Sequence, residues 1–147
     1  MYVADEQESE IIEIDSLFKE VLLIQIKCKT GCNLLVGCIY RSPSSTADND
    51  SLLCHLINQI CAYRNSEPII MGDFNFRDID WDKWDSTTTN KGENLFLSNL
   101  RDNFLFQHVH TPTRARGSQT PHILDLVITK DEILENIEYL ARLMPLS

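Results

Sequence analysis

The sequence predicts a single domain of mixed α/β structure, and three observations support this class. Short apolar segments typical of strands alternate along the chain with longer segments whose apolar residues recur at helical spacing. Two of the apolar segments, 21–27 and 34–40, are separated by a short polar turn that contains Gly31. This arrangement favours an antiparallel hairpin, and therefore a mixed sheet over a purely parallel one. The chain has 147 residues, enough for one domain with a sizeable core.

The two hairpin strands are apolar at nearly every position, which predicts that both of their faces are covered. A polar loop, 41–46, follows the second strand. Asp48, Asn49 or Asp50 can then act as the N-cap of a helix that ends near 64–65. The helix is predicted because its apolar residues recur in pairs: Leu52 and Leu53, Leu56 and Ile57, and Ile60 and Cys61.

The second half of the chain continues this alternation. An apolar strand over 67–71 is followed by a polar stretch and then by a helix from about 92 to 102. Further strands are expected over 104–109 and 123–129, and 137–143 is a candidate for a last strand. The second helix is expected to bury one stripe of side chains: Leu95, Phe96, Leu100 and Phe104.

The composition excludes several classes of protein. The net charge of −9 argues against broad electrostatic adhesion to nucleic acid, since such binding depends on Lys and Arg. No apolar segment approaches the ~20 residues that a membrane span needs, and the acidic N-terminus lacks the apolar segment of a secretory signal. The five cysteines have no regular spacing, as expected for free thiols in a reducing compartment. We therefore expect an intracellular protein, nuclear or cytoplasmic, that is neither secreted nor bound to a membrane.

The best candidates for chemistry are Asp73 and Asn75, an acid and a carboxamide at the end of an apolar strand. Side chains alternate along an extended chain, so these two are expected to point the same way. Gly72, just before them, permits a turn or a close approach of the backbone. Such a pair could form an ordinary turn, or a small polar cluster that binds a phosphate or a metal ion. From these residues alone the two interpretations are evenly balanced.

Three other places carry candidate groups. Asp125 interrupts an apolar strand, and because a buried carboxylate without a partner is costly, it should have one. Tyr40 and Arg41 end a strand with two groups that bind phosphate well, although on their own they fit an ordinary strand end. Thr113 and Arg114 lie in a basic segment, which is rare in this acidic chain. The segment could serve a function, or it could be an ordinary polar loop.

Two familiar metal motifs are excluded by spacing. The acidic segment 78–85 has Lys83 where a calcium-binding loop needs Gly, and Thr89 where it needs Glu. Cys28 and Cys32 lack the second pair that a tetrahedral zinc site requires. We expect the acidic segment to be a solvated loop that is anchored by Trp81 and Trp84.

Taken in order, five segments resemble those of one family. They are Tyr40-Arg41-Ser42-Pro43, Gly72-Asp73-Phe74-Asn75, Asp78-Ile79-Asp80-Trp81, 107–114 and 124–129. The ordered set resembles the endonuclease/exonuclease/phosphatase superfamily, and within it the apurinic-type endonuclease domain of non-LTR retrotransposons. The resemblance covers nearly the whole chain.

This resemblance implies a four-layer α/β/β/α sandwich, in which two mixed sheets are flanked by helices. It also implies a phosphodiesterase that nicks DNA with Mg²⁺ or Mn²⁺ as its cofactor. In such an enzyme Asp73 would position or deprotonate the attacking water, Asn75 would hold the scissile phosphate, and Tyr40 would contact that phosphate near the transition state. Asp125 would orient a catalytic histidine through its second ring nitrogen.

The remaining roles concern phosphate binding. By the same resemblance, Thr113 would contact the substrate phosphate. Arg41 and Arg114 are candidates for binding it because they carry guanidinium groups. A reverse-transcriptase domain is expected in the parent element.

The chain departs from the family pattern at both ends, so 1–147 is expected to be a partial domain. Members carry a metal-binding Glu before the segment that Met1 begins, so the principal metal ligand is left unassigned. Members also end with Ser-Asp-His, whereas this chain ends at Ser147. We therefore expect weak nicking or none. Two alternatives remain open: a phosphomonoesterase or lipid phosphodiesterase on the same fold, and a non-catalytic relic of the domain.

Overall fold

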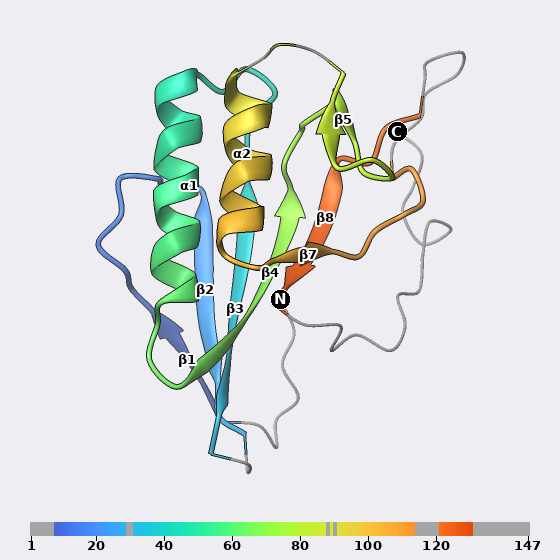
Figure 1. The fold of residues 1–147 in the computed structure, drawn as a ribbon. Helices are drawn as coiled ribbons and strands as arrows, with labels where there is room; N and C mark the ends of the chain where they lie inside the picture. The colour runs from blue at the N-terminus through green and yellow to red at the C-terminus, as the bar shows by residue number, and fades with distance from the viewer. Residues whose placement is uncertain (1–7, 29–30, 88, 90, 114–120, 131–147) are drawn as a thin grey trace, which may run out of the picture.

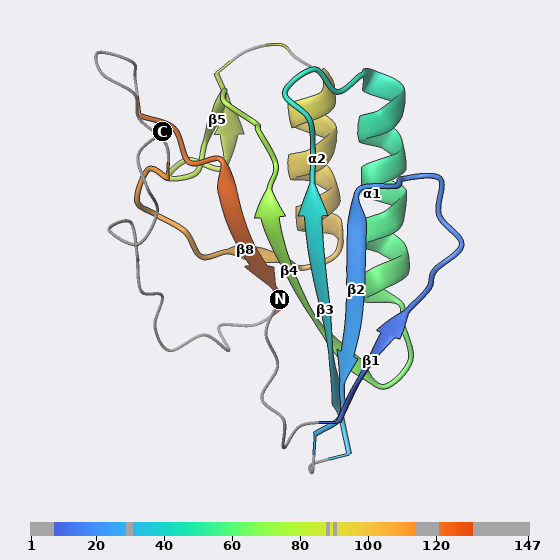
Figure 2. The same cartoon turned by 180° about the vertical axis from the view of Figure 1, so that it is seen from behind.

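The computed structural model describes residues 8–28, 31–87, 89, 91–113 and 121–130. It shows a mixed sheet with two helices packed side by side against it (Figure 1). Both helices lie in front of the sheet in one view and behind it in the reversed view, so they cover the same face (Figures 1 and 2). The mixed α/β class is confirmed, and the described residues contribute one helical layer and one main sheet to it.

The main sheet has six strands in the order β1-β2-β3-β4-β8-β7. Their bounds are β1 (Ser9–Ile12), β2 (Val21–Ile26), β3 (Asn33–Tyr40), β4 (Ser66–Asp73), β7 (Phe106–Gln107) and β8 (Asp125–Thr129). A separate two-stranded sheet pairs β5 (Ile79–Asp80) with β6 (Asp85–Ser86). The helices are α1 (Ala47–Cys61) and α2 (Lys91–Asp102). Within the described residues, no helix is both long and apolar enough to cross a membrane.

The strand directions bring three strand ends together. β2 and β3 pair antiparallel, which confirms the predicted hairpin. β3 then pairs parallel with β4, the strand that follows α1, and β8 lies antiparallel on the other side of β4. The C-terminal ends of β3 and β4 therefore meet the beginning of β8 at one edge of the sheet (Figure 2).

The core lies between the helices and one face of the sheet. Leu35 and Ile39 of β3 and Ile70 of β4 are buried there. Leu22, which points to the other face, is 39% exposed. Within the described part of the chain, the prediction that both faces of the hairpin strands are covered is therefore not met.

The buried stripe of α2 differs in part from the predicted one. Phe96 and Leu100 are fully buried, as expected, and Leu97 joins them. Leu95 and Phe104 are exposed instead. Phe104 lies beyond the end of the helix and has a positive φ of 56°, so helical spacing no longer determines its direction.

Several element boundaries also differ from the prediction. Thr46, rather than one of the three acidic or amide residues at 48–50, caps α1, and its Oγ1 accepts the backbone N–H of Asn49 at 3.1 Å. β7 is shorter than the predicted 104–109, and β1 was not predicted. The candidate strand 137–143 lies outside the described residues.

The acidic segment forms the short β5–β6 hairpin, so the prediction of a loop is corrected, while its predicted anchoring by the two tryptophans is confirmed. Its anchor is Trp81, which is buried and meets Trp84 edge to face with ring centroids 5.3 Å apart. Trp81 also contacts the ring of Phe96 from α2. Apolar packing of these rings holds the hairpin to the core, while Asp82 between them remains exposed.

Candidate active site

Tyr40, Asp73 and Asp125 lie in one row across three adjacent strands. Tyr40 of β3 pairs with Asp73 of β4, and Asp73 pairs with Asp125 of β8. Paired residues project from the same face of a sheet. Because the neighbouring Ile39 and Leu126 are buried under the helices, the row projects from the opposite face. The structure thus brings together three of the predicted site residues, which lie far apart in the sequence.

Asp73 and Asp125 form a non-hydrogen-bonded antiparallel pair, the type in which the two side chains lie nearer to each other. The backbone N–H of Phe74 donates to the carbonyl of Leu124 at 2.8 Å, so this pair carries a hydrogen bond between the two strands. The next pair along, Asp73 and Asp125, is then a pair without ladder bonds, in which Cα atoms are about 4.5 Å apart and side chains are nearest. Like charges in directly opposite positions destabilise a sheet. The pair therefore places two acidic groups side by side on this face of the sheet.

Gly72 allows the backbone to approach its neighbour strand directly before Asp73. Its φ is +145°, a backbone angle that residues with a side chain rarely adopt. A Cβ built on it would lie 1.8 Å from the backbone oxygen of Ile39. Only glycine fits between the strands at this position. The glycine of the Gly72-Asp73-Phe74-Asn75 segment therefore sets the path of the backbone from which Asp73 projects.

Asn75 lies in a tight turn rather than on an extended strand. β4 ends at Asp73, and Asn75 has a positive φ of 53°. The expectation that strand alternation aligns Asn75 with Asp73 is therefore corrected. Asn75 is buried, and its Nδ2 donates to the carbonyl oxygen of Arg41 at 2.5 Å.

The Arg41 side chain lies inside the protein. Its Nε and Nη2 donate to the two carboxylate oxygens of Asp50 at 2.7 and 3.0 Å, and its Nη1 reaches the carbonyls of Phe74 and Asn75 at 3.1 and 3.3 Å. Both side chains of the Arg41–Asp50 ion pair are less than a tenth exposed. The predicted phosphate contact of Arg41 is without support, because the guanidinium group is buried among protein oxygens.

Thr113 holds the beginning of β8. Its Oγ1 accepts the backbone N–H groups of Leu124 and Asp125, each at 3.1 Å, and its own N–H donates to the carbonyl of His122 at 3.0 Å. With two bonds accepted, the hydroxyl keeps its proton for donation to another group. Arg114, the other predicted phosphate ligand in this loop, lies outside the described residues.

Sequence reasoning missed Asp50 altogether as part of this region. It considered the residue only as a helix cap, whereas the carboxylate is buried and bonded to Arg41 and to the hydroxyl of Ser45. Asp50 lies in the first turn of α1, where acids are common for another reason, their favourable interaction with the helix dipole. The sequence therefore gave no signal that separated this acid from the neighbouring Asp48.

The residues present fit a hard divalent cation in part. Among the described residues, no group of three or more His, Cys, Asp and Glu could hold a metal ion. The Asp73–Asp125 pair nevertheless offers two carboxylates on one face of the sheet. Mg²⁺ is commonly bound by one or two carboxylates together with substrate phosphates, so this donor set is suited to an ion shared with a substrate.

Comparisons with known proteins identify the family of the chain and proteins of similar fold. Residues 34–144 match the family model described as endonuclease-reverse transcriptase. Among solved structures, the chain is similar to the endonuclease domain of TRAS1, a telomere-specific non-LTR retrotransposon, with a TM-score of 0.59 and 11% identity over 86% of this chain and 55% of that one. No curated protein matches the chain significantly.

Two further structures are less similar. One is an endonuclease/exonuclease/phosphatase family protein from Bacteroides thetaiotaomicron, with a TM-score of 0.49 and 14% identity over 86% of this chain and 49% of that one. The other is D. rerio TDP2 complexed with a single-strand DNA product, with a TM-score of 0.47 and 13% identity over 83% and 51%. The chain spans about half the length of the structures it matches. At these identities the likeness to solved structures shows the fold.

Proposed function

Because the chain belongs to the endonuclease–reverse transcriptase family, we propose that it supplies part of the active site of an endonuclease that nicks DNA. The observation that carries the proposal is the register of the sheet, which sets Asp73 opposite Asp125 and beside Tyr40. Hydrolysis of a phosphodiester needs a base for water, negative ligands for a cation and donors to the phosphate oxygens. Two carboxylates and a phenol in one row are suited to these tasks.

Asp73 is the proposed base, which positions the attacking water and accepts its proton. Tyr40 is 49% exposed beside it, and its hydroxyl is proposed to donate to an oxygen of the scissile phosphate. Asn75 uses one amide N–H on the carbonyl of Arg41, and its second N–H is proposed to bind the phosphate.

Asp125 and Thr113 are proposed to act from the other side of the row. Asp125 is half-buried, and its carboxylate can accept the N–H of an imidazole, as the resemblance implies. The Thr113 hydroxyl proton is available to a phosphate oxygen, while its oxygen fixes the backbone of Asp125.

A divalent cation, Mg²⁺ or Mn²⁺, would be held by Asp73 and Asp125, and when bound it would offset negative charge on the phosphate and make the water more acidic. The need for such an ion agrees with the net charge of −9, which by itself repels DNA. The family match supports DNA as the substrate and a reverse-transcriptase domain as the partner. In this proposal 1–147 forms one partial domain of the larger enzyme.

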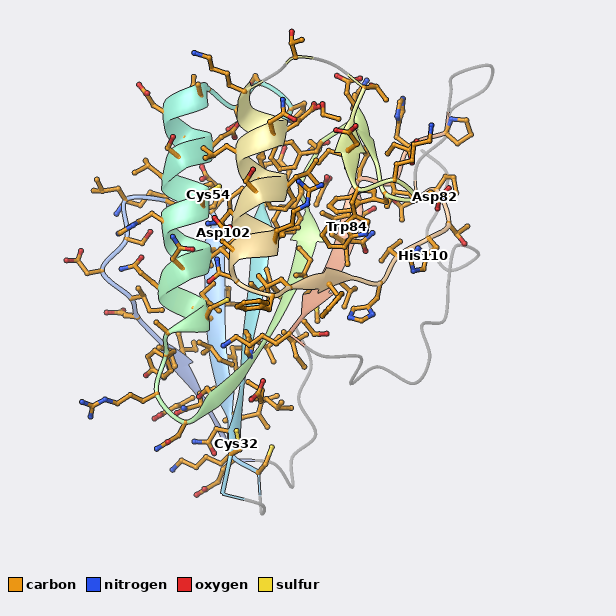
Figure 3. The ribbon with its side chains drawn as sticks, viewed as in Figure 1. Cys32, Cys54, Asp82, Trp84, Asp102 and His110 are labelled. Carbon is orange, nitrogen blue, oxygen red and sulfur yellow. The ribbon has the colours of Figure 1, made fainter. Side chains whose placement is uncertain are left out.

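The proposal is tested by nicking of supercoiled plasmid by the 147-residue chain with Mg²⁺ or Mn²⁺. We expect weak nicking that EDTA abolishes and that Asp73→Asn lowers by about 10²-fold or more, the usual cost of losing a positioned base. Asp102→Asn is the matched control, because Asp102 lies on α2, which covers the opposite face of the sheet (Figure 3). Nicking that is equal in the parent chain and in Asp73→Asn would overturn the proposal.

A further inference from the structure

We propose that Arg41 is a positioning residue, which fixes the turn from Asp73 to Phe76 and is itself held by Asp50. The inference rests on the proposed function of that turn, and it replaces a direct contact between Arg41 and phosphate. Asp50, which lies in α1, thereby becomes part of a site whose other residues lie at the ends of strands.

Arg41 contacts every residue of the turn. Its backbone N–H donates to the carbonyl of Asp73 at 2.8 Å, and its own carbonyl accepts the Asn75 side-chain amide at 2.5 Å. Its Nη1 donates to the carbonyls of Phe74 and Asn75 at 3.1 and 3.3 Å. Its Cζ lies 3.9 Å from the centroid of the Phe76 ring, which is the distance of a cation–π contact.

These contacts supply hydrogen-bond donors to backbone carbonyls of the turn that have no partner within the turn itself. The turn leaves β4 with a positive φ at Asn75, so the carbonyls of Phe74 and Asn75 have left the regular ladder. Buried carbonyls without partners are costly, and the planar guanidinium group supplies both with donors at fixed angles. A lysine could not do the same, since its ammonium group lacks the forked geometry.

Asp50 fixes the direction of the guanidinium group. Its two oxygens accept Nε and Nη2 of Arg41 side by side, the geometry that gives an arginine–carboxylate pair its orientation. The hydroxyl of Ser45 donates to Oδ1 of the same carboxylate at 2.8 Å, and the Asp50 backbone N–H donates to the carbonyl of Thr46 at 2.9 Å. The first turn of α1 is thus connected through Asp50 and Arg41 to Asn75.

A buried ion pair is a poor way to gain stability, because apolar residues of the same size often stabilise a protein more. Such a pair does fix geometry. Arg41 donates to the carbonyls of Asp73 and Phe74, and these two bonds fix the turn. Small displacements of catalytic groups cost rate: about 1 Å can lower it by about 10²-fold. The position of the Asn75 amide relative to Asp73 is therefore the property that Arg41 controls.

The test uses the full 147-residue chain and its Arg41→Lys and Asp50→Asn variants. Circular dichroism checks folding, and nuclear magnetic resonance follows the side-chain amide of Asn75. We expect the Asn75 amide protons to shift and to exchange with water about 10-fold faster or more in both variants. We also expect nicking to lose kcat by about 10- to 100-fold with KM nearly unchanged, because the turn is displaced while substrate binding elsewhere persists.

Leu56→Ala is the matched control. Leu56 is fully buried in α1, where it lines a pocket with Phe18 and Leu23. Truncation should weaken the fold there, while the Asn75 amide should keep its shift and its slow exchange. If Arg41→Lys fails to fold, Asp50→Asn decides alone, because it keeps the shape of the side chain. An Asn75 amide unchanged in the folded variant, or one that moves equally in Leu56→Ala, overturns the inference.

Failure of the proposed function has a different signature. A parent chain whose nicking does not depend on Asp73 rejects the proposed function, whereas the Asn75 resonance still decides whether Arg41 holds the turn. If the Asn75 amide is displaced while kcat is unchanged, the claim that Arg41 positions Asn75 for the reaction is rejected, and the proposed function remains intact.

Discussion

Asp73 and Asp125 lie directly opposite each other in adjacent antiparallel strands, on the face of the sheet opposite to the buried Leu126. The two acids are 52 positions apart along the chain, as their numbers show. Their pairing follows from the order of the strands, in which β8 inserts beside β4. This pairing should affect both the free energy of unfolding and the rate of nicking.

Asp125→Asn should separate function from stability. Replacing one of two opposed carboxylates removes repulsion, so the free energy of unfolding should stay the same or rise by about 0.2–1 kcal/mol. Nicking should fall by about 10²-fold or more, because a neutral amide is a much poorer ligand for a divalent cation than a carboxylate. Urea denaturation and plasmid nicking measure the two effects. A loss of stability above about 1 kcal/mol would indicate that Asp125 has a structural role instead.

Gly72→Ala should be among the most damaging single substitutions in the sheet. The added Cβ would meet the backbone oxygen of Ile39 at 1.8 Å, so the two strands must separate, at an expected cost of about 3 kcal/mol or more. Gly31→Ala is the control, because Gly31 also has a positive φ but no atom lies within 4 Å of its Cβ position. Its cost should be limited to about 1–2 kcal/mol of backbone strain. Equal losses in thermal or urea unfolding would contradict the strand-contact explanation.

Thr113→Val should loosen the beginning of β8 without changing the shape of the side chain. The substitution leaves the N–H groups of Leu124 and Asp125 without their acceptor, each at an expected cost of about 1–3 kcal/mol if no water replaces it. Amide hydrogen exchange should therefore accelerate at Asp125. Thr87→Val is a suitable control, since Thr87 is exposed and distant in sequence. Unchanged protection of the Asp125 amide would show that Thr113 does not hold the strand.

The cysteines should differ in reactivity in the folded chain. Burial raises the pKa of the Cys54 thiol to about 12, and the nearby Asp50 carboxylate adds to this. Because the thiolate is the reactive form, Cys54 should resist a thiol reagent at pH 8 until denaturant is added. The exposed Cys32, at the far end of the β2–β3 hairpin, should react at once (Figure 3).

The Asp50→Asn variant extends this measurement. Removing the carboxylate should lower the pKa of Cys54 and make labelling begin at a lower pH, although burial keeps the pKa above that of a free thiol. Mass spectrometry of the labelled chain identifies the reacted cysteine at each pH. Rapid labelling of Cys54 at pH 8 in the folded parent chain would contradict the burial of this thiol.

The regular part of the fold was predictable because its signal is local. The β2–β3 hairpin and both helices follow from apolar spacing, which depends only on neighbouring residues. Phe104 was misplaced because the helix ends two residues earlier, and a spacing rule does not show where a helix stops. The cap of α1 was misplaced because Thr46 and the acids after it are all good caps, and only the backbone geometry selects among them.

The sequence predicts which residues the candidate site would bring together, but it does not predict how they are connected. Asp73, Tyr40 and Asp125 could be named from motif resemblance, and the register then placed them in one row. The sequence predicts Arg41 as a phosphate ligand because a guanidinium group binds phosphate and carboxylate with the same geometry. The sequence does not show which of the two is present, and here the partner is Asp50, nine residues later on a different element.

The most direct test of the account is Mn²⁺ titration of the 147-residue chain followed by nuclear magnetic resonance. The paramagnetic ion broadens signals near its binding site, so the measurement locates a cation without requiring cleavage. We expect the amide signals of Tyr40, Asp73 and Asp125 to broaden first, and we expect Asp73→Asn to remove this effect. Broadening that begins instead at the acidic β5–β6 hairpin, with Tyr40, Asp73 and Asp125 unaffected, would contradict the claim that the opposed carboxylates form the active site.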